Sequence, residues 1–450
     1  MIELPNDFSD KRICVLGLGY VGLTLAVAMA RVGFHVHGLE VQKDIITSLS
    51  KHKAHFWEKN LDINLNQVIN NGNFTFSEDL DRSVDASVYI VTVGTPLDSN
   101  NKARLDMISN AVQQIANHMN DGALIILRST VKIGTARNVI TPILEKTGKK
   151  FEIAVCPERT LEGQALDELN FLPQIIGADS QSALFRAGKI FNFLTPTILK
   201  VSSLEASEVI KLVDNTYRDV MFGFANEVAR VCDAVGISAH EVIRTGKLGY
   251  ERTNVAFPGP VGGPCLEKDP HILVESARSY GIDLDITPAS RRINERQPLE
   301  VVNFIKKTSR LKKDFPLHPK ISLLGIAFKG KPETNDLRGS VAKPILDLIK
   351  KEFPDSILQG FDPVVSNKDI AEFGLIPVSG INEAFKGVSI VIILNNHPFF
   401  SQISIDEKVE IMHSDGFIYD LWGLFNGLEH NCLSGVSYYA LGSQGKKCII

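Results

Sequence analysis

The feature that most constrains this chain is a glycine-rich turn placed directly after a short apolar run. Residues Ile13–Leu16 are apolar and predict a buried β-strand, and Gly17, Gly19 and Gly22 follow at GxGxxG spacing. In a dinucleotide-binding turn the first glycine permits the tight bend, the second lets backbone approach a pyrophosphate, and the third lets helix and strand pack closely. The sequence therefore predicts a strand, a phosphate-binding turn and a helix from about Leu23.

An acidic residue follows this turn at the spacing expected of a dinucleotide site. Glu40 ends the next apolar run, His35–Leu39, where a carboxylate binds ribose hydroxyls. Its charge would repel a 2′-phosphate, so the predicted cofactor is NAD rather than NADP. The alternative, a glycine-rich turn without a ligand, is weakened because strand, helix and acid are all in register. The predicted dinucleotide contacts here are Gly17, Gly19, Tyr20, Val21, Gly22 and Glu40.

Short apolar runs alternate with amphipathic stretches at both ends of the chain, which predicts βαβ units and parallel sheets. Between them, from Ser202 to Arg291, the periodicity becomes that of long helices. The predicted fold class is α/β, with two Rossmann-like parallel-sheet domains joined by a central helical domain. The expected strands are 13–16, 35–39, 87–93, 123–127 and 152–156 in the first sheet, and 321–328, 357–361, 388–394, 417–419 and 437–441 in the second.

The domain boundaries follow from these changes of pattern. Gly360 and Asp362 repeat the spacing of Gly38 and Glu40, so the two ends of the chain look like a degenerate structural repeat. The expected domains are an N-terminal NAD-binding domain (1–200), a central helical domain (201–300), a linker (301–319) and a C-terminal Rossmann-like domain (320–450).

The central block opens with a long predicted helix. Ser202 and Glu205 have the spacing of a capping box, and apolar residues then recur at helical spacing to about Ala234. Met221 and Phe222 lie off the main apolar face, which leaves more apolar surface than one neighbour would cover. We expect a central helix that is packed on both sides, with a second subunit as the candidate for the second side.

Composition and charge argue against several classes of protein. Lys and Arg number 48 against 52 Asp and Glu, and the net charge of -4 argues against a nucleic-acid binder with a basic surface. The start of the chain lacks the basic and apolar regions of a signal peptide, and no membrane partner is predicted. Six cysteines without a CxxC pair predict reduced thiols and a cytoplasmic protein. No metal site is predicted.

Polar residues follow several predicted strands, at the sheet edge where ligands bind in such folds. Thr95 and Thr130 are candidates for cofactor contact, with a plain turn and a helix N-cap as equal alternatives. Glu158, Arg159 and Glu162 could serve proton transfer or bind a polar substrate. On these residues alone, the alternative of a solvated loop with a surface ion pair is preferred.

Three polar residues share one face of the central helix. Glu208, Lys211 and Asn215 stand at i, i+3 and i+7. Lys211 and Asn215 both donate hydrogen bonds, so side by side they could hold a developing oxyanion. The alternative is the wet side of a helix, but the neighbouring positions are largely apolar and favour a buried polar pair.

The most informative stretch runs from Phe257 to Pro270 and places Cys265 among glycines, prolines and charges before a predicted helix. A thiol beside a helix N-terminus and a lysine ionises more readily, and the thiolate is the nucleophile. Asp269 has the position of an N-cap, with Pro270 as the first helical residue. The alternative for Cys265, a buried inert thiol, is opposed by its flanking glycines and charges. That alternative suits the cysteines in apolar patterns, Cys14, Cys156 and Cys232.

Three cations follow the first strand of the second sheet. Lys329, Lys331 and Arg338 could meet phosphates there. Arg338 could instead pair with Asp336, a contact that is worth little if exposed.

Together these motifs resemble the UDP-glucose/GDP-mannose dehydrogenase superfamily, the UDP-sugar 6-dehydrogenases, in order along nearly the whole chain. The cysteine motif is highly specific and the others reinforce it. Such enzymes join an N-terminal NAD domain, a central helical dimerisation domain and a C-terminal UDP-binding domain, and they oxidise a sugar C6 alcohol to a carboxylate with two NAD. The segments that carry the resemblance are 17–22, 94–96, 129–131, 157–158, 211–215, 262–269, 328–329 and 336–338.

The resemblance implies roles for individual residues. Cys265 would attack the C6 aldehyde, and a second hydride transfer would leave a thioester that water cleaves. Lys211 and Asn215 would stabilise the oxyanion, and Asp269 would position or activate a water. The residues implied to aid proton transfer and hydrolysis are Thr130 and Glu158, and those implied to bind the sugar nucleotide are Glu158, Glu162, Lys211, Asn215, Arg252, Phe257, Gly259, Gly262 and Lys329.

The resemblance also implies partners. The substrate would be a UDP-sugar, the enzyme a homodimer or higher homo-oligomer, and its pathway surface polysaccharide synthesis. Arg338 would contact NAD, and Arg252 would reach a neighbouring subunit's site. Pro157-Glu158-Arg159 and Asp269-Pro270 look more like the branch that acts on UDP-N-acetylhexosamines than the UDP-glucose branch.

Two departures and two alternatives accompany the resemblance. The chain has more residues between Phe328 and Arg338 than the usual motif, and Glu40 replaces a more common Asp. A single-step NAD dehydrogenase of the 3-hydroxyacid or 6-phosphogluconate kind would have no use for Cys265 or a second sheet domain. A non-catalytic nucleotide-binding scaffold would have no use for the catalytic set, although fold alone never proves function.

Overall fold

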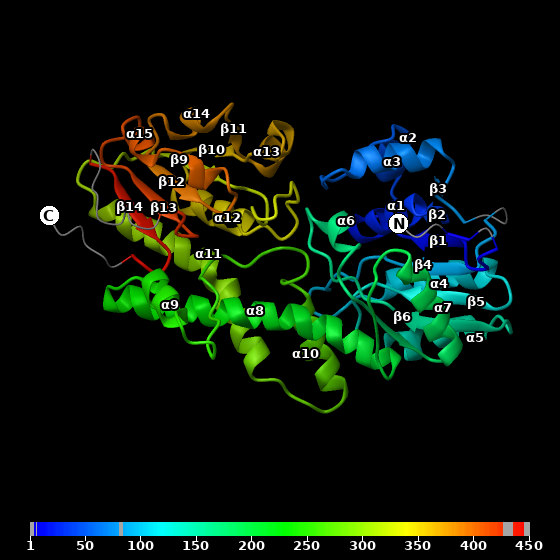
Figure 1. The fold of residues 1–450 in the computed structure, drawn as a ribbon. Helices are drawn as coiled ribbons and strands as arrows, with labels where there is room; N and C mark the ends of the chain where they lie inside the picture. Colours follow the sequence, from blue (N-terminus) through cyan, green and yellow to red (C-terminus); the bar gives the residue numbers. More distant parts are fainter. Residues whose placement is uncertain (1–3, 6, 81–83, 426–434, 445–450) are drawn as a thin grey trace. The chain divides into compact units, whose positions relative to one another are not determined.

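The computed structural model describes residues 4–5, 7–80, 84–425 and 435–444, which form two compact units. The first unit comprises residues 1–215 and 271–283, and the second comprises 216–270 and 284–450. The division falls within a long helix, α8 (Leu204–Val235), so each unit includes part of it (Figure 1).

The first unit is built on an eight-stranded sheet in the order β3-β2-β1-β4-β5-β6-β7-β8. Neighbouring strands are parallel except β6 and β7, which run antiparallel and correct the prediction of a wholly parallel sheet. All five predicted strands are present, whereas β3, β7 and β8 are additional. The strands are β1 (Arg12–Leu16), β2 (His35–Leu39), β3 (Phe74–Ser77), β4 (Val88–Val91), β5 (Ala123–Leu127), β6 (Phe151–Val155), β7 (Gln174–Ala178) and β8 (Ile198–Lys200).

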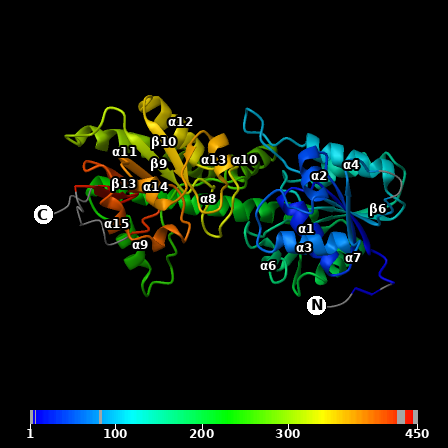
Figure 2. The same ribbon diagram turned by 90° about the horizontal axis from the view of Figure 1, so that it is seen from above.

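Helices cover both faces of this sheet, because successive side chains of a strand point to opposite sides. Ile13 and Val15 pack with α1, α2, α3, α6 and α7, whereas Cys14 and Leu16 pack with α4, η1 and α5. Figure 2 shows α4 and α7 on opposite sides of the strands. The helices are α1 (Tyr20–Arg31), α2 (Lys43–Ser50), α3 (Leu61–Asn70), α4 (Asp106–His118), the π-helical turn η1 (Ala136–Ile140), α5 (Thr141–Glu145), α6 (Ala165–Glu168) and α7 (Gln181–Asn192).

The second unit contains a six-stranded, wholly parallel sheet in the order β11-β10-β9-β12-β13-β14. All five predicted strands are present, and β11 is additional. One face packs on α11, α12 and α13, and the other on α14 and α15. The strands are β9 (Lys320–Leu324), β10 (Ile357–Phe361), β11 (Ile376–Pro377), β12 (Ile390–Ile393), β13 (Phe417–Asp420) and β14 (Ser437–Ala440).

Two helices, α8 and α11, bear on the sequence predictions. Part of the expected linker 301–319 is helical, because α11 continues as far as Leu311. The long helix α8 is capped by Ser203 rather than Ser202, since the Ser203 hydroxyl accepts the Ala206 N–H at 3.1 Å. The remaining helices are α9 (Ala239–Lys247), α10 (Asp269–Ser279, shared by both units), α11 (Ile286–Leu311), α12 (Ala342–Glu352), α13 (Asn367–Phe373), α14 (Ile381–Phe385), η2 (Phe400–Gln402) and α15 (Ile405–Val409).

One face of α8 is exposed within this chain. Tyr217, Phe224 and Val231, spaced seven residues apart, keep 62%, 54% and 62% of their surface accessible. Ala225 and Ala229 of the same helix are fully buried. The prediction that this helix packs on both sides therefore holds for one side within the chain.

The predicted α/β architecture with two Rossmann-like sheets is thus confirmed, with one antiparallel strand pair as its exception. Among the helices of the described ranges, none combines the length and apolarity needed to cross a membrane.

Candidate active site

The glycine turn after β1 has the geometry of a phosphate-binding turn. Gly17 adopts a φ of +91°, which favours glycine, and its N–H donates to the Leu39 carbonyl at 2.8 Å. A Cβ on Gly22 would lie 1.8 Å from the Gly17 carbonyl oxygen, so no side chain fits there. A Cβ on Gly19 would meet nothing within 4 Å, which leaves space beside the start of α1 for a ligand. All three glycines therefore meet the steric demands of the fingerprint.

Glu40 lies beside this turn. Its Oε2 accepts the Leu18 N–H at 2.8 Å and its Oε1 accepts the Gln42 N–H at 2.9 Å, and the residue is 5% exposed. A carboxylate has about four lone-pair sites, so these two bonds leave capacity for ribose hydroxyls. The open glycine position, the helix start and this carboxylate fit a bound NAD.

Tyr20 and Val21 open α1, so their N–H groups have no acceptor within the helix and can meet a phosphate. The Tyr20 side chain points elsewhere. Its hydroxyl donates to Oε2 of Glu58, and the same oxygen accepts the Gly163 N–H at 2.7 Å. No sequence motif marks Glu58, which stands in an irregular polar segment between α2 and α3.

Thr95 and Thr130, both predicted beside the cofactor, contact each other. The Thr95 hydroxyl donates to the Thr130 carbonyl at 2.6 Å and thereby joins the segments that follow β4 and β5. The alternative of Thr130 as a helix N-cap is wrong, because the next helical turn, η1, begins at Ala136 after Thr135.

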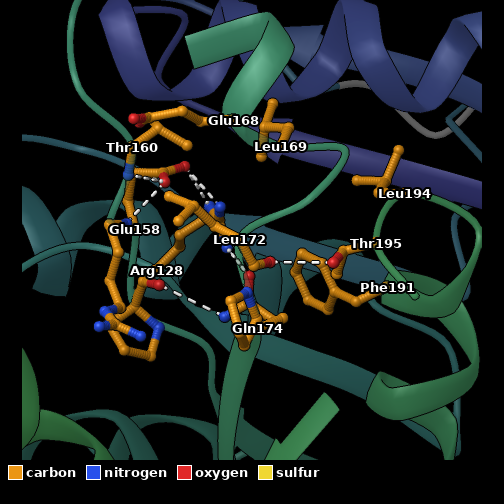
Figure 3. Close-up of a pocket in the computed structure, with 13 residues that line it drawn as sticks. Arg128, Glu158, Thr160, Glu168, Leu169, Leu172, Gln174, Phe191, Leu194 and Thr195 are labelled. Carbon is orange, nitrogen blue, oxygen red and sulfur yellow. Dashed lines mark hydrogen bonds and ion pairs between the residues drawn. The ribbon is translucent and has the colours of Figure 1, made fainter. Parts of the chain in front are cut away.

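A buried ion pair lies near these strand ends. Arg128 is 2% exposed and donates through Nε and Nη2 to Oε2 of Glu158, with the Nε contact at 3.0 Å. Its Nη1 donates to the Cys156 carbonyl at 3.0 Å and to Gln174 Oε1 at 2.9 Å. Arg128, Glu158 and Gln174 line a cavity of about 20 Å³, room for about one water. Figure 3 shows these three side chains and the hydrogen bonds between them.

This arrangement overturns the surface ion pair that the sequence favoured for Glu158. Arg159 pairs instead with Asp214, at 3.0 Å. Burial opposes ionisation of Glu158, but the Arg128 charge and the Thr160 N–H outweigh it and hold the pKa of this carboxyl below its usual value. Glu158 is therefore a carboxylate at neutral pH and acts as a fixed acceptor and charge. Arg128 was missed as its partner, although an arginine directly after an apolar strand was the available signal.

The three polar residues of the α8 face, Glu208, Lys211 and Asn215, are buried or half-buried. Glu208 is 3% exposed, and its carboxylate accepts the N–H groups of Gly134 and Ala136. Burial raises the pKa of Glu208 to about 7. Asn215 is 5% exposed and Lys211 is half-buried, and the Lys211 charge helps to lower the pKa of Glu158. Lys211 and Glu158 are thus brought into the same electrostatic environment.

The cysteine turn lies in the second unit. Cys265 is exposed, whereas the three other cysteines in the described residues are buried. The Cys265 carbonyl accepts the Asp269 N–H at 2.9 Å, which links the thiol-bearing residue to the start of α10. Asp269 is fully buried and pairs with Lys268 at 2.7 Å. The helix begins at Asp269 itself, one residue earlier than predicted.

The glycines before Cys265 pack against the segment that follows β9. Gly263 has a φ of +97° and donates its N–H to the Gly339 carbonyl at 2.8 Å. A Cβ on Gly263 would lie 2.5 Å from the Phe328 ring, and one on Gly262 would lie 2.4 Å from the Gly339 oxygen. These contacts fix the backbone that leads into Cys265.

The start of the same loop is tied to α8. Asn226 is fully buried and exchanges two hydrogen bonds with the Gly259 backbone, at 3.0 and 3.1 Å. Phe257 stacks on His240 with ring centroids 5.3 Å apart, and Lys247 lies 4.8 Å from its centroid. Both Phe257 and Gly259 are therefore held in place before any ligand binds.

A buried polar network that sequence analysis missed holds the loop on the other side of Cys265. Arg291 is 4% exposed and donates from Nη1 to Asp219, which is fully buried, and to the Leu266 carbonyl at 2.8 Å. Asn294 also donates to Asp219, at 2.8 Å. The available signal was the spacing of Arg291 and Asn294 on one face of α11.

Glu162 is half-buried in the first unit, and the remaining predicted residues, Arg338, Lys329 and Arg252, belong to the second unit. Arg338 pairs with Asp336 at 2.6 Å and its side chain is 61% exposed, as the alternative for this pair expected. Lys329 lies over the Phe328 ring, and Arg252 lies over Tyr250 with its guanidinium carbon 4.9 Å from the centroid. In the described ranges, no three His, Cys, Asp or Glu side chains gather as a metal site requires.

Comparison with known proteins shows that parts of one family match both units. The chain matches models for three parts of the UDP-glucose/GDP-mannose dehydrogenase family: the NAD binding domain at residues 11–195, the central domain at 205–296 and the UDP binding domain at 322–427.

Individual relatives match along most of their length. The UDP-N-acetyl-D-mannosamine dehydrogenase of Campylobacter jejuni is 31% identical over 424 residues, which covers 90% of this chain and 99% of the relative. That of Methanococcus maripaludis strain S2 is 30% identical over 415 residues, with 91% and 92% covered. The solved UDP-D-ManNAc dehydrogenase of Pyrococcus horikoshii superimposes with a TM-score of 0.86 at 28% identity, covering 96% of this chain and 100% of that chain.

Proposed function

Because this chain belongs to the UDP-glucose/GDP-mannose dehydrogenase family and is an NAD-dependent enzyme, we propose that it oxidises the C6 alcohol of a UDP-N-acetylhexosamine to a carboxylate in two steps. The choice of an N-acetylhexosamine rests on the Pro157-Glu158-Arg159 and Asp269-Pro270 motifs, and it agrees with the names of the relatives that match most of the chain. UDP-glucose is the competing substrate.

The reaction balances as a four-electron oxidation. NAD, when bound, supplies the chemistry of accepting one hydride from C6 in each oxidation. The first oxidation removes a hydride and the hydroxyl proton and leaves an aldehyde. The Cys265 thiolate adds to the aldehyde carbon to form a thiohemiacetal, whose oxidation gives a thioester. Water then cleaves the carbon–sulfur bond, which releases the carboxylate and restores the thiol.

The chain's own residues divide this work. Lys211 and Asn215 donate hydrogen bonds to the oxyanion that forms when sulfur or water attacks the carbonyl. Asp269 positions or activates the hydrolytic water, and its burial beside Lys268 supports a fixed carboxylate in that role. Thr130 contributes to the first proton transfer. Glu158, with the pKa of its carboxyl lowered, acts as a fixed acceptor rather than as a proton donor.

Binding roles follow the same division. The glycine turn and Glu40 hold NAD, with contributions from Thr95 and Arg338. The sugar nucleotide is bound by both the loop before the cysteine turn and the residues after β9. In this proposal the substrate contacts include Glu162, Arg252, Phe257, Gly259, Gly262 and Lys329. The domain boundaries at 200, 300 and 320 and the cytoplasmic location stay predictions.

The observation that carries the proposal is the exposure of Cys265 at the start of α10. A buried thiol could not reach a substrate, and the three other described cysteines are buried. Fixed backbone on both sides of Cys265, through Gly263 and Leu266, supports a nucleophile that is held ready for attack.

The test is the stoichiometry of the purified enzyme with UDP-ManNAc, UDP-GlcNAc, UDP-GalNAc and UDP-glucose. We expect two NADH and one carboxylate for each sugar nucleotide consumed, measured by absorbance and mass spectrometry. Cys265→Ser should lower carboxylate release by about a thousandfold or more, because the thioester cannot form. Cys232→Ala, which removes a buried thiol, is the matched control and should keep its turnover.

Other outcomes separate the alternatives. One NADH with a released aldehyde or ketone identifies a single-step dehydrogenase, and full turnover by Cys265→Ser excludes the covalent mechanism. No reduction with any of the four sugars identifies a nucleotide-binding scaffold.

We further propose that the enzyme is a homodimer that buries the exposed face of α8. Tyr217, Phe224 and Val231 present an apolar stripe with seven-residue spacing, the repeat that packs helix against helix. Sedimentation velocity tests this, and Phe224→Glu should yield monomers if the stripe is the interface.

A further inference from the structure

The loop that carries Glu162 is held by carboxylates at almost every backbone N–H group. Glu158 Oε1 accepts from Arg159 and Thr160, at 2.7 and 2.8 Å. Glu168 Oε2 accepts from Leu161 at 2.6 Å. The Gly163 N–H, directly after Glu162, donates to Glu58. Two of these carboxylates belong to the loop or to α6 at its end, whereas Glu58 comes from a distant part of the chain.

Glu58 joins three segments at a single oxygen. It lies between α2 and α3 and is 5% exposed. Its Oε2 accepts the Gly163 N–H at 2.7 Å and also the hydroxyl of Tyr20, the first residue of α1. The Tyr20 oxygen lies 2.9 Å from the same Gly163 nitrogen, so the three groups form a closed cluster. The Phe56 ring packs on Tyr20 with centroids 4.7 Å apart.

The protonation states suit this cluster. Burial, followed by the Glu58 charge, raises the pKa of Tyr20 well above its usual value, so the hydroxyl keeps its proton and donates it to Glu58. The charge of Glu162 acts on Tyr20 in the same direction, which places the Glu162 carboxylate near the cluster. Burial also raises the pKa of Glu58, although hydrogen bonds from Tyr20 and from the N–H groups of Gly163, Leu166 and Ala165 oppose it.

A buried carboxylate carries a desolvation cost that an apolar residue would avoid. An apolar side chain at position 58 could fill the same volume but could not accept the Gly163 N–H. The function that requires an acceptor here is therefore the fixing of the loop, rather than the filling of space.

We propose that Glu58 is a positioning residue that fixes the loop 159–163 to the start of α1, and so sets the place of Glu162 relative to the dinucleotide turn. The proposal rests on the proposed function in one respect, namely that Glu162 contacts the sugar nucleotide. Glu58 itself touches neither ligand and acts through Tyr20 and Gly163.

The structural arm of the test uses the unliganded protein. Hydrogen exchange of peptides that cover 159–168 should become about tenfold faster or more in Glu58→Leu, because the Gly163 N–H loses a charged acceptor. Glu58→Gln keeps an oxygen acceptor and should restore most of the protection. Glu145→Leu, which changes an exposed glutamate on α5, is the matched control and should leave this segment unchanged.

The kinetic arm asks which constant moves. In Glu58→Leu the KM for the sugar nucleotide should rise about tenfold, while kcat and the Kd for NADH measured without sugar change less than about threefold. General destabilisation would lower the active fraction and hence kcat without changing the KM of the folded molecules. Tyr20→Phe removes one oxygen from the cluster and should give a smaller shift in the same direction.

The outcomes separate this proposal from the proposed function. Wild-type exchange in Glu58→Leu, or an unchanged KM for the sugar nucleotide, overturns the positioning role. If the wild-type enzyme oxidises no UDP-sugar, the proposed function fails and the exchange experiment still decides whether Glu58 fixes the loop. If Glu58→Leu does not fold, Tyr20→Phe decides, and wild-type exchange and an unchanged KM for the sugar nucleotide in that variant overturn the role.

Discussion

The turns after the first strand of each sheet, β1 and β9, share the same hydrogen-bonding pattern. In the first, Gly17 donates to Leu39, and Glu40 at the end of the next strand accepts a turn N–H. In the second, Gly325 donates to the Phe361 carbonyl at 2.9 Å, and Asp362 accepts the N–H groups of Ile326 and Ala327 at 2.7 and 3.1 Å. The repeat that Gly38-Leu-Glu40 and Gly360-Phe-Asp362 predicted is therefore present at the level of individual hydrogen bonds.

The turns differ at their middle position. Gly19 of the first turn faces open space, and α1 begins at the next residue. The corresponding Ala327 is 3% exposed, so protein atoms surround this position. The second turn is thus packed with protein, and the chain continues to Ala342 before α12 begins. Of the two turns, only the first leaves its middle position open, as close approach of a pyrophosphate requires.

Replacing the two turn carboxylates, Asp362 and Glu40, should have the largest effect on stability and should differ between the two units. Asp362 accepts four backbone N–H groups and Glu40 accepts two. Asp362→Ala should therefore lower the free energy of unfolding of its unit by about 4 kcal/mol, against about 2 kcal/mol for Glu40→Ala. Denaturant unfolding measures both, because Trp57 reports the first unit in a Trp422→Phe background and Trp422 reports the second in Trp57→Phe.

Equal losses would contradict this comparison, since they would mean that the number of amides held does not set the contribution. Asp362→Asn, which keeps one acceptor oxygen, is the control and should lose less than Asp362→Ala.

Buried carboxyl groups elsewhere in the two units should make the stability of each unit depend on pH in a different range. Burial raises the pKa of Glu208 in the first unit to about 7 from 4.5, and that of Asp233 in the second to about 6 from 3.8. The folded state binds each proton more tightly than the unfolded state, so the stability from each group is full at low pH and declines as the pH rises through these windows. The decline is at most about 3 kcal/mol for each group.

Glu208→Gln should therefore flatten the decline between pH 4.5 and 7, and Asp233→Asn should flatten it between pH 3.8 and 6. Unfolding at each pH, followed through the tryptophan of the same unit, measures the difference from the wild type. A variant whose pH profile parallels the wild type would show that its carboxyl is not the group that titrates.

The smallest expected effect concerns the empty middle position itself. Gly19→Ala adds a methyl group where no protein atom lies within 4 Å, so stability should change little. The methyl group would occupy space that a pyrophosphate needs, and the Kd for NAD should rise about tenfold. Titration of NADH fluorescence measures this. Unchanged NAD affinity would place the dinucleotide elsewhere, and Ala327→Gly, the reciprocal change, should leave NAD binding unaffected.

Local patterns predicted much of this molecule. The turn at Gly17, its carboxylate and the strands on either side could be read because each depends on residues close together in the sequence. Burial of Cys14, Cys156 and Cys232, and exposure of Cys265, followed from their apolar or polar neighbours. The roles assigned to the site residues stay predictions.

Contacts between distant segments could not be read in the same way. Arg128 and Glu158 are thirty residues apart and meet only because β5 and β6 are neighbours in the sheet. Glu58 stands in an irregular segment whose partners, Tyr20 and Gly163, are set by packing. The antiparallel strand β7 left no periodic signal, because its five residues are nearly all buried.

Residues from the segments around the C-terminal sheet pack against Gly259, Gly262 and Gly263 and so support the backbone before Cys265. The Trp422 ring, the Phe328 ring and the Gly339 carbonyl all press on this stretch of backbone, and none of them would exist in a chain cut before β9. A protein shortened to the first sheet and the helices would thus lack the groups that support the backbone before Cys265. The domain expected to recognise the uridine nucleotide therefore also packs against the backbone that leads into the proposed nucleophile.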